Sequence, residues 1–378
     1  MISIISILGA AVPACADEAP EVPPIVWEGE HLRFGTSEDL DAVCAGTLPY
    51  ADDLVEHMAH LLGAAEPTVD FYWVPDGLDR YCVPEQVGCT VGSSVFSQFV
   101  LHQHEFVHAL RDHGAYRPLE EGLAELYGDD WEAFYHLEGD VIEMFETHDK
   151  KPLEGPWYPL AGFFASFLRH HAGTADFLAF VEATNKGDSW DVTERMFTEF
   201  FDATVDDLVA DQTATYPRCN QTIYRDNSFE CSRPGVTLPP EGSTEVTTIT
   251  VAMGCGDADV LGPRRGERWV TMAVDNPAEG VFEIGLNKVG GTGPGHFESR
   301  RCDQSCADGR MNLLTVPLDY PAVASQAAPD EGEERWQYQV CLPGGIHLAR
   351  FAVEEDDTDT ELIMWLRRTD GSTKGCDK

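Results

Sequence analysis

The chain is poor in positive charge. Of its 378 residues, 25 are lysine or arginine and 66 are aspartate or glutamate, so the formal net charge is -41 at pH 7. A surface of this sign repels a phosphate backbone, and we therefore expect no nucleic-acid partner. The acidic excess favours a strongly solvated surface.

Long hydrophobic runs are also scarce. The first twelve residues contain the apolar run from Ile2 to Val12, which is too short to span a bilayer but has the length of an export signal. No lysine or arginine precedes Arg33, so the basic region that usually opens such a signal is missing. No later segment is long and apolar enough for a membrane span.

We predict a signal peptide over residues 1–16, followed by a proline-rich linker over 17–24, and two cleavage sites are open. One lies after Ala16, where small residues stand at the positions that such a cut requires. The segment "VPAC" resembles the lipobox of bacterial lipoproteins, in which Cys15 would carry the lipid. We therefore expect an exported protein that is either lipid-anchored in the cell envelope or extracellular. Nothing in the length requires an oligomer, and we expect a monomer.

Cysteine, in contrast, is well represented, with eleven residues. Setting Cys15 aside leaves an even number, which in an exported chain predicts up to five disulfides. Three of these cysteines precede residue 104 and seven follow it, so complete pairing requires at least one bridge between the two groups. The ten are Cys44, Cys82, Cys89, Cys219, Cys231, Cys255, Cys302, Cys306, Cys341 and Cys376.

Periodicity predicts an α+β fold in two domains. Strands are expected over 31–36 and 68–75, a helix over 48–63, and an edge strand around "SSVFS" at 93–97. Helical patterns then dominate to about residue 214. These features form the first domain, 25–231.

After a linker over 232–244 the pattern changes to period-two alternation, which predicts an antiparallel β-sandwich over 245–378. The alternating runs lie near residues 249–253, 282–286, 336–340 and 362–366.

The segment "HEFVH" brings chemistry to the helical part. His104 and His108 are four residues apart, so on a helix they point about 40° apart and can share one metal ion. Glu105 lies at the edge of the same face, where it can take a proton from water that the metal activates. The spacing predicts metal-assisted hydrolysis, with two ligands identified.

A third ligand is needed to leave one position of the metal open for water. Pro118 is suited to the first turn of a second helix, and "LEEGLAEL" follows it. Glu121 and Glu125 lie four residues apart on one face of that helix. Either glutamate can be the third ligand.

The segment "PLEEGLAELY" resembles the "WLxEGxAxY" segment of the gluzincin zinc peptidases, which include thermolysin and the aminopeptidase N family. The resemblance implies Zn2+ as cofactor and Glu121 as its third ligand. It also implies that Glu125 holds a ligand histidine from behind. The spacer of twelve residues between His108 and Glu121 is shorter than in those two families, which keeps Glu125 open as the ligand.

A second likeness lies downstream. "YPLAGFFASFL" is similar to a helix of the aminopeptidase N family whose tyrosine donates a hydrogen bond to the oxyanion, and Tyr158 takes that position. The "GxMEN" substrate-amine motif is absent, so specificity for free N-termini does not carry over. We expect a zinc metallopeptidase that acts on a peptide or protein. The alternative is a catalytically inactive surface binding or scaffold lipoprotein on the same fold.

Overall fold

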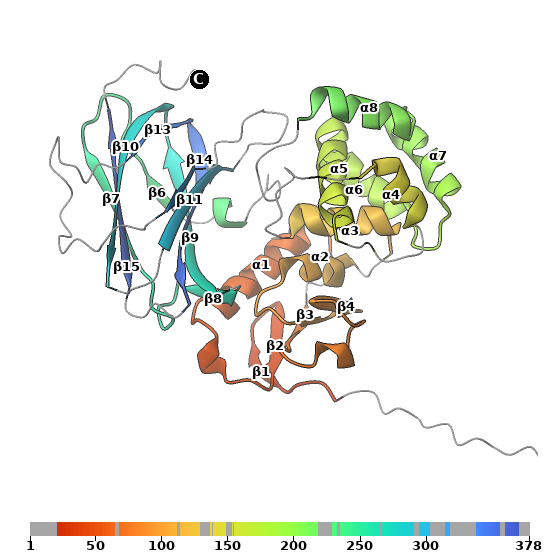
Figure 1. Ribbon diagram of the computed structural model, residues 1–378, viewed down its shortest axis with the longest axis horizontal. Helices are drawn as coiled ribbons and strands as arrows, with labels where there is room; N and C mark the ends of the chain where they lie inside the picture. Colours follow the sequence, from red (N-terminus) through yellow and green to blue (C-terminus); the bar gives the residue numbers. More distant parts are fainter. Residues whose placement is uncertain are drawn as a thin grey trace, which may run out of the picture.

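The computed structural model is a mixed α and β structure, which is compatible with the predicted α+β class (Figure 1). The predicted signal peptide with Cys15 lies outside the described residues, as do Cys219, Cys306, Trp336 and Cys376. The described residues are 21–64, 68–111, 114–128, 137, 139–148, 153, 155–217, 229–232, 235–264, 266–290, 295–302, 314–317, 338–355 and 360–369.

The chain begins with a five-stranded sheet of order β1-β2-β3-β5-β4. Strands β2, β3 and β5 are parallel, and β1 and β4 run antiparallel to their neighbours. The bounds are β1 (Ile25–Glu28), β2 (Leu32–Thr36), β3 (Val69–Trp73), β4 (Gly88–Val91) and β5 (Ser94–Ser97).

The strands predicted at 31–36 and 68–75 are confirmed as β2 and β3. The expected edge position of "SSVFS" is wrong, because this segment forms β5 between β3 and β4. A tight turn in which Gly92 has φ 60° reverses the chain between β4 and β5, and so places β4 at the edge.

The described chain has eight α-helices. The first two contact this sheet, and the others pack on the second helix or on one another (Figure 1). The predicted first helix is confirmed, and it ends at Gly63 in the left-handed conformation. The bounds are α1 (Thr47–Leu62), α2 (Gln103–Arg111), α3 (Arg117–Tyr127), α4 (Val141–Thr147), α5 (Trp157–Ala172), α6 (Thr174–Ala183), α7 (Trp190–Phe201) and α8 (Val205–Thr215).

The remaining strands form a sandwich of two sheets. One sheet has the order β13-β10-β15-β7 and the other β12-β11-β14-β9-β6, with β8 beside β9. The bounds are β6 (Gly235–Thr237), β7 (Val246–Ala252), β8 (Leu261–Arg264), β9 (Glu267–Asn276), β10 (Gly280–Val289), β11 (Gly295–Arg301), β12 (Leu314–Pro317), β13 (Tyr338–Leu342), β14 (Gly345–Glu354) and β15 (Glu361–Arg368).

The alternating residues predicted for the sandwich core, such as Phe282, Ile284 and Met364, are buried between the sheets. Strand β6 lies within the segment expected to be a linker and pairs with β9. The domain boundaries stay predictions.

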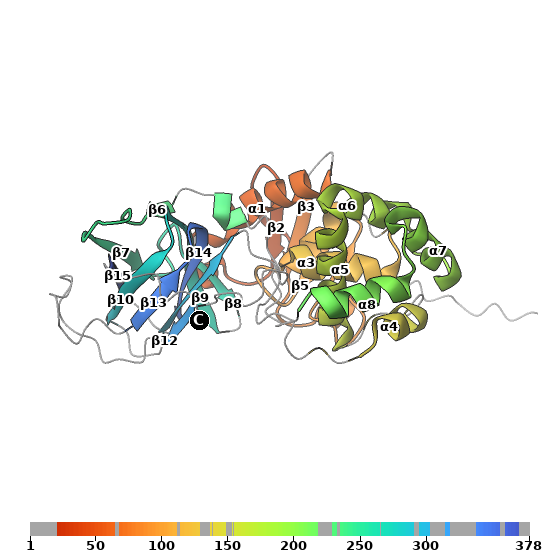
Figure 2. The same ribbon diagram turned by 90° about the horizontal axis from the view of Figure 1, so that it is seen from above.

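The sandwich is tied to the first part of the chain (Figure 2). A disulfide joins Cys44, ahead of α1, to Cys255, ahead of β8, which confirms the predicted cross-bridge. Trp269 of β9 also belongs to the core cluster that contains the helices. The contact with the sandwich therefore includes α1, which packs beside α2, the helix that carries the two histidines.

Two further disulfides join Cys82 to Cys89 and Cys231 to Cys302, and Cys341 is also disulfide-bonded. Bridges of this kind persist in oxidising compartments. Within the described residues, no helix has the length and apolarity needed to cross a membrane.

Candidate metal centre

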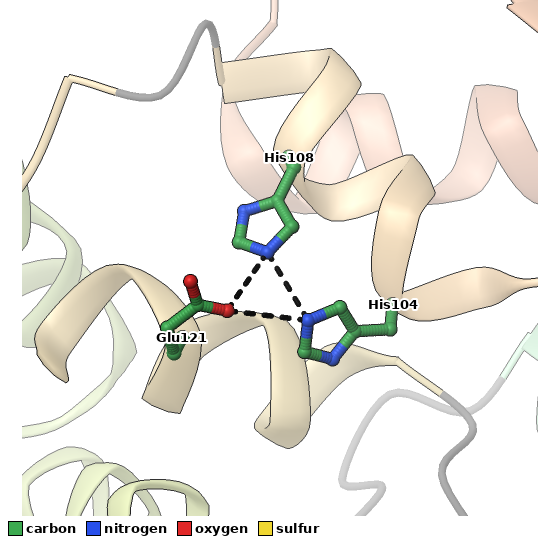
Figure 3. Close-up of side chains that lie close together, drawn as sticks. All are labelled: His104, His108 and Glu121. Atoms are coloured by element: carbon green, nitrogen blue, oxygen red, sulfur yellow. Dashed lines mark hydrogen bonds and ion pairs between the residues drawn. The ribbon is translucent and has the colours of Figure 1, made fainter. Parts of the chain in front are cut away.

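Helices α2 and α3 bring three ligand atoms to one point (Figure 3). The Nε2 atom of His108 lies 3.1 Å from Nε2 of His104 and 3.1 Å from Oε2 of Glu121. The third side of the triangle, from His104 Nε2 to Glu121 Oε2, is 3.3 Å. The two histidines and Glu121 thus each offer one atom with which they can hold a metal ion together.

Glu125 lies behind this triangle. Its Oε1 atom is 3.1 Å from Nδ1 of His104, the ring nitrogen that faces away from Glu121. A carboxylate that contacts Nδ1 cannot share a metal with Nε2 of the same ring. The geometry therefore separates the two glutamates that the sequence left open.

Glu120, which the sequence reasoning missed, holds the other histidine. Its Oε1 atom is 3.5 Å from Nδ1 of His108, and its second oxygen is 3.9 Å from Nε of Arg111. Both carboxylates are buried, at 4% exposure for Glu120 and 2% for Glu125. A carboxylate behind each imidazole fixes the ring and directs Nε2 towards the shared point. In the sequence, the sign of this role was the position of Glu120 directly before Glu121 in "LEEG".

The chemistry of this donor set fits a cation. With a carboxylate behind each Nδ1, the two neutral rings would both point a lone pair at the third oxygen, an arrangement that repels unless positive charge lies between the atoms. A tetrahedral ion with bonds of about 2.0–2.1 Å separates its ligands by roughly 3.3 Å, close to the triangle observed.

In the metal-free protein, protons on the two histidines supply the positive charge between the ligand atoms. Burial by itself would lower the pKa of His104, but Glu121 and Glu125 outweigh it and raise that pKa well above its ordinary value. Burial would also lower the pKa of His108, but Glu121 and Glu120 outweigh it and raise that pKa to about 9. Burial would raise the pKa of Glu121, yet the two imidazoles hold it well below its usual range.

Close helix packing places Glu121. A Cβ atom at Gly122 would lie 2.7 Å from the carbonyl oxygen of Ala161 on α5, so only glycine lets α3 approach α5 this closely. Pro118 lies in the first turn of α3, as predicted. Gly122 thus has a packing role, because the close approach of α3 to α5 sets the position of Glu121.

Glu105 lies beside the triangle on α2 and is 7% exposed. Its Oε2 atom accepts a hydrogen bond of 2.7 Å from Oγ1 of Thr90, which belongs to the edge strand β4. The carboxylate is therefore oriented by the strand opposite it. Thr90 carried no sequence signal.

Tyr158 lies at the start of α5, with its ring centroid 5.9 Å from that of His104. Burial and the neighbouring carboxylates of Glu121 and Glu105 raise the pKa of Tyr158 well above its ordinary value, so the phenol keeps its proton. Its hydroxyl makes no hydrogen bond within the described part of the chain. It is available as a donor.

These groups line one open cleft of about 860 Å³. Residues of β4 and of the disulfide-closed segment between Cys82 and Cys89 form part of its wall, and Tyr158 forms another part. A volume of this size accepts a stretch of peptide or another ligand of several hundred daltons.

The chain matches no protein-family model and no curated protein.

Proposed function

We propose that the protein is an exported zinc-dependent metallopeptidase of the gluzincin type. The observation that carries the proposal is the convergence of His104, His108 and Glu121 in a cleft that also contains Glu105 and Tyr158. Two imidazoles and one carboxylate are a ligand set of zinc sites that hydrolyse peptides. A bound zinc ion would polarise a carbonyl group and acidify water.

The side chains divide the remaining work. Glu105, oriented by Thr90, takes a proton from water at its free carboxylate oxygen and can pass it to the leaving amine. Tyr158 donates its hydroxyl hydrogen to the oxygen on which negative charge develops. Glu120 and Glu125 keep the imidazoles in the ligand orientation.

The edge strand favours a peptide substrate. In the described sheet β4 pairs only with β5, and its residues line the cleft. An extended peptide can add to a free strand edge through its main chain, which secures binding without a fixed sequence. Export stays a prediction with which the disulfides are consistent, and lipid attachment at Cys15 and a monomeric state stay predictions.

The test is metal content and proteolysis of the purified full chain. We expect about one equivalent of zinc, cleavage of a mixed peptide library, and loss of both on chelation. Glu105→Gln should keep the zinc and lose cleavage.

Protein that binds no zinc would refute the proposal. Protein that binds zinc and cleaves nothing would be the inactive binding or scaffold lipoprotein.

A further inference from the structure

Two cations that line the same cleft have no partner within the described part of the chain. Arg117, the first residue of α3, is half-buried, and Lys186, in the loop after α6, is exposed. Among the residues that the structure describes, neither side chain forms an ion pair or a hydrogen bond, although the chain is rich in acidic residues. Nearby Arg111 behaves differently, since it lies 3.9 Å from both Glu120 and Glu182.

The backbone holds the two cations together. The Lys186 N–H donates to the carbonyl of Gly114 at 2.9 Å, and the Tyr116 N–H donates to Oγ1 of Thr184 at 3.1 Å. These bonds fasten the loop after α6 to the turn that begins α3. Arg117 and Lys186 therefore lie on adjoining segments of the cleft wall although they are far apart in sequence.

Their position relative to the metal centre follows from the helix. Arg117 precedes Glu121 by four residues, so both lie on one face of α3, about 6 Å apart along its axis. An extended peptide advances roughly 3.3 Å per residue, so a group bound at Arg117 belongs about one or two residues from the bond cleaved.

We propose that Arg117 and Lys186 form a carboxylate-binding subsite that selects the substrate, a proposal that rests on the peptidase function. A guanidinium and an ammonium that lie on adjoining segments of the cleft wall, with no partner among the described residues, match a carboxylate, which accepts from both. The carboxylate is either the C-terminus of the peptide, whose cleavage then releases a short C-terminal fragment, or an aspartate or glutamate side chain. Arg117 and Lys186 are specificity-determining residues of the same site.

The test uses a synthetic peptide library in different chemical forms, incubated with the zinc-loaded full chain. The forms have free C-termini, C-terminal amides, or C-terminal amides with asparagine and glutamine in place of the acidic residues. Arg117→Gln and Lys186→Gln are compared with Arg195→Gln, which removes an exposed cation of α7 outside the cleft. Mass spectrometry identifies the cut sites, and Arg117→Lys tests rescue.

We expect Arg117→Gln to raise KM about tenfold or more for peptides that carry the carboxylate, with kcat little changed. Lys186→Gln should raise KM less, and Arg195→Gln should have no effect. Loss of cleavage on C-terminal amidation assigns the subsite to the terminus, and loss only in the form without acidic residues assigns it to a side chain.

Equal cleavage of all forms by the wild type, or equal effects of Arg117→Gln on all forms, would overturn the subsite while leaving the peptidase intact. If no form is cleaved, the peptidase function fails. The subsite is then decided by binding of fluorescent free-acid and amide peptides to Glu105→Gln protein and to the same protein with Arg117→Gln. A preference for the acid that disappears with Arg117 supports the subsite, and equal binding excludes it.

Discussion

Replacing Glu121 and Glu125 separately by glutamine tests which glutamate is the third ligand. Glu121 Oε2 lies 3.1 and 3.3 Å from the two Nε2 atoms, whereas Glu125 contacts Nδ1 of His104. Zinc sites with four ligands bind with about 10–16 kcal/mol, so one ligand contributes roughly 3 kcal/mol. Glu121→Gln should therefore weaken zinc binding about 100-fold or more. Loss of an orienting carboxylate, as in Glu125→Gln, should cost about 10- to 100-fold.

Because the two ranges meet, affinity alone does not decide the assignment. Competition titration with a chelating dye gives the affinities, and cobalt substitution gives the ligand set through the visible spectrum. Glu121→Gln should change the cobalt spectrum, and Glu125→Gln should preserve it at higher metal concentration. The reverse result, with the spectrum altered only in Glu125→Gln, would refute the assignment of Glu121 as the third ligand.

Other predictions concern the donor, pH and the disulfide between the two parts. Tyr158→Phe should lower kcat about 100-fold at unchanged zinc content, and an unchanged kcat would remove the donor role. Because the pKa of His108 is raised to about 9 without metal, zinc must displace protons, so its apparent affinity should rise as pH increases from 6.5 towards 9; a flat profile in dye competition would contradict this. In the same metal-free state, the stability that charged His108 contributes should be complete below about pH 6.5 and be lost as pH rises through about 9, as thermal unfolding with chelator can measure. Cys44→Ser with Cys255→Ser opens a loop of 211 residues and should lower the free energy of unfolding by up to about 5 kcal/mol in denaturant titration; no loss would mean that the bridge leaves the unfolded chain unrestricted.

Much of the fold follows from local pattern. The stop of α1 at Gly63, the start of α3 near Pro118 and the buried alternation in the sandwich are each encoded within a few consecutive residues. The edge of the first sheet was assigned wrongly, because strand order depends on which strands meet in space. The chain reverses at Gly92 and β4 pairs with the outer side of β5, so β4 is the edge strand. The periodicity of the sequence does not show this strand order.

The same distinction between local pattern and tertiary structure holds for the candidate metal centre. The sequence alone determined that His104 and His108 share a helix face, since a separation of four residues fixes their direction within one helix. Only the tertiary structure decided between Glu121 and Glu125, because that choice depends on how closely α3 approaches α2 and α5, which Gly122 permits. The placement of Arg117 and Lys186 on adjoining segments is likewise tertiary, since two hydrogen bonds between segments distant in sequence create it.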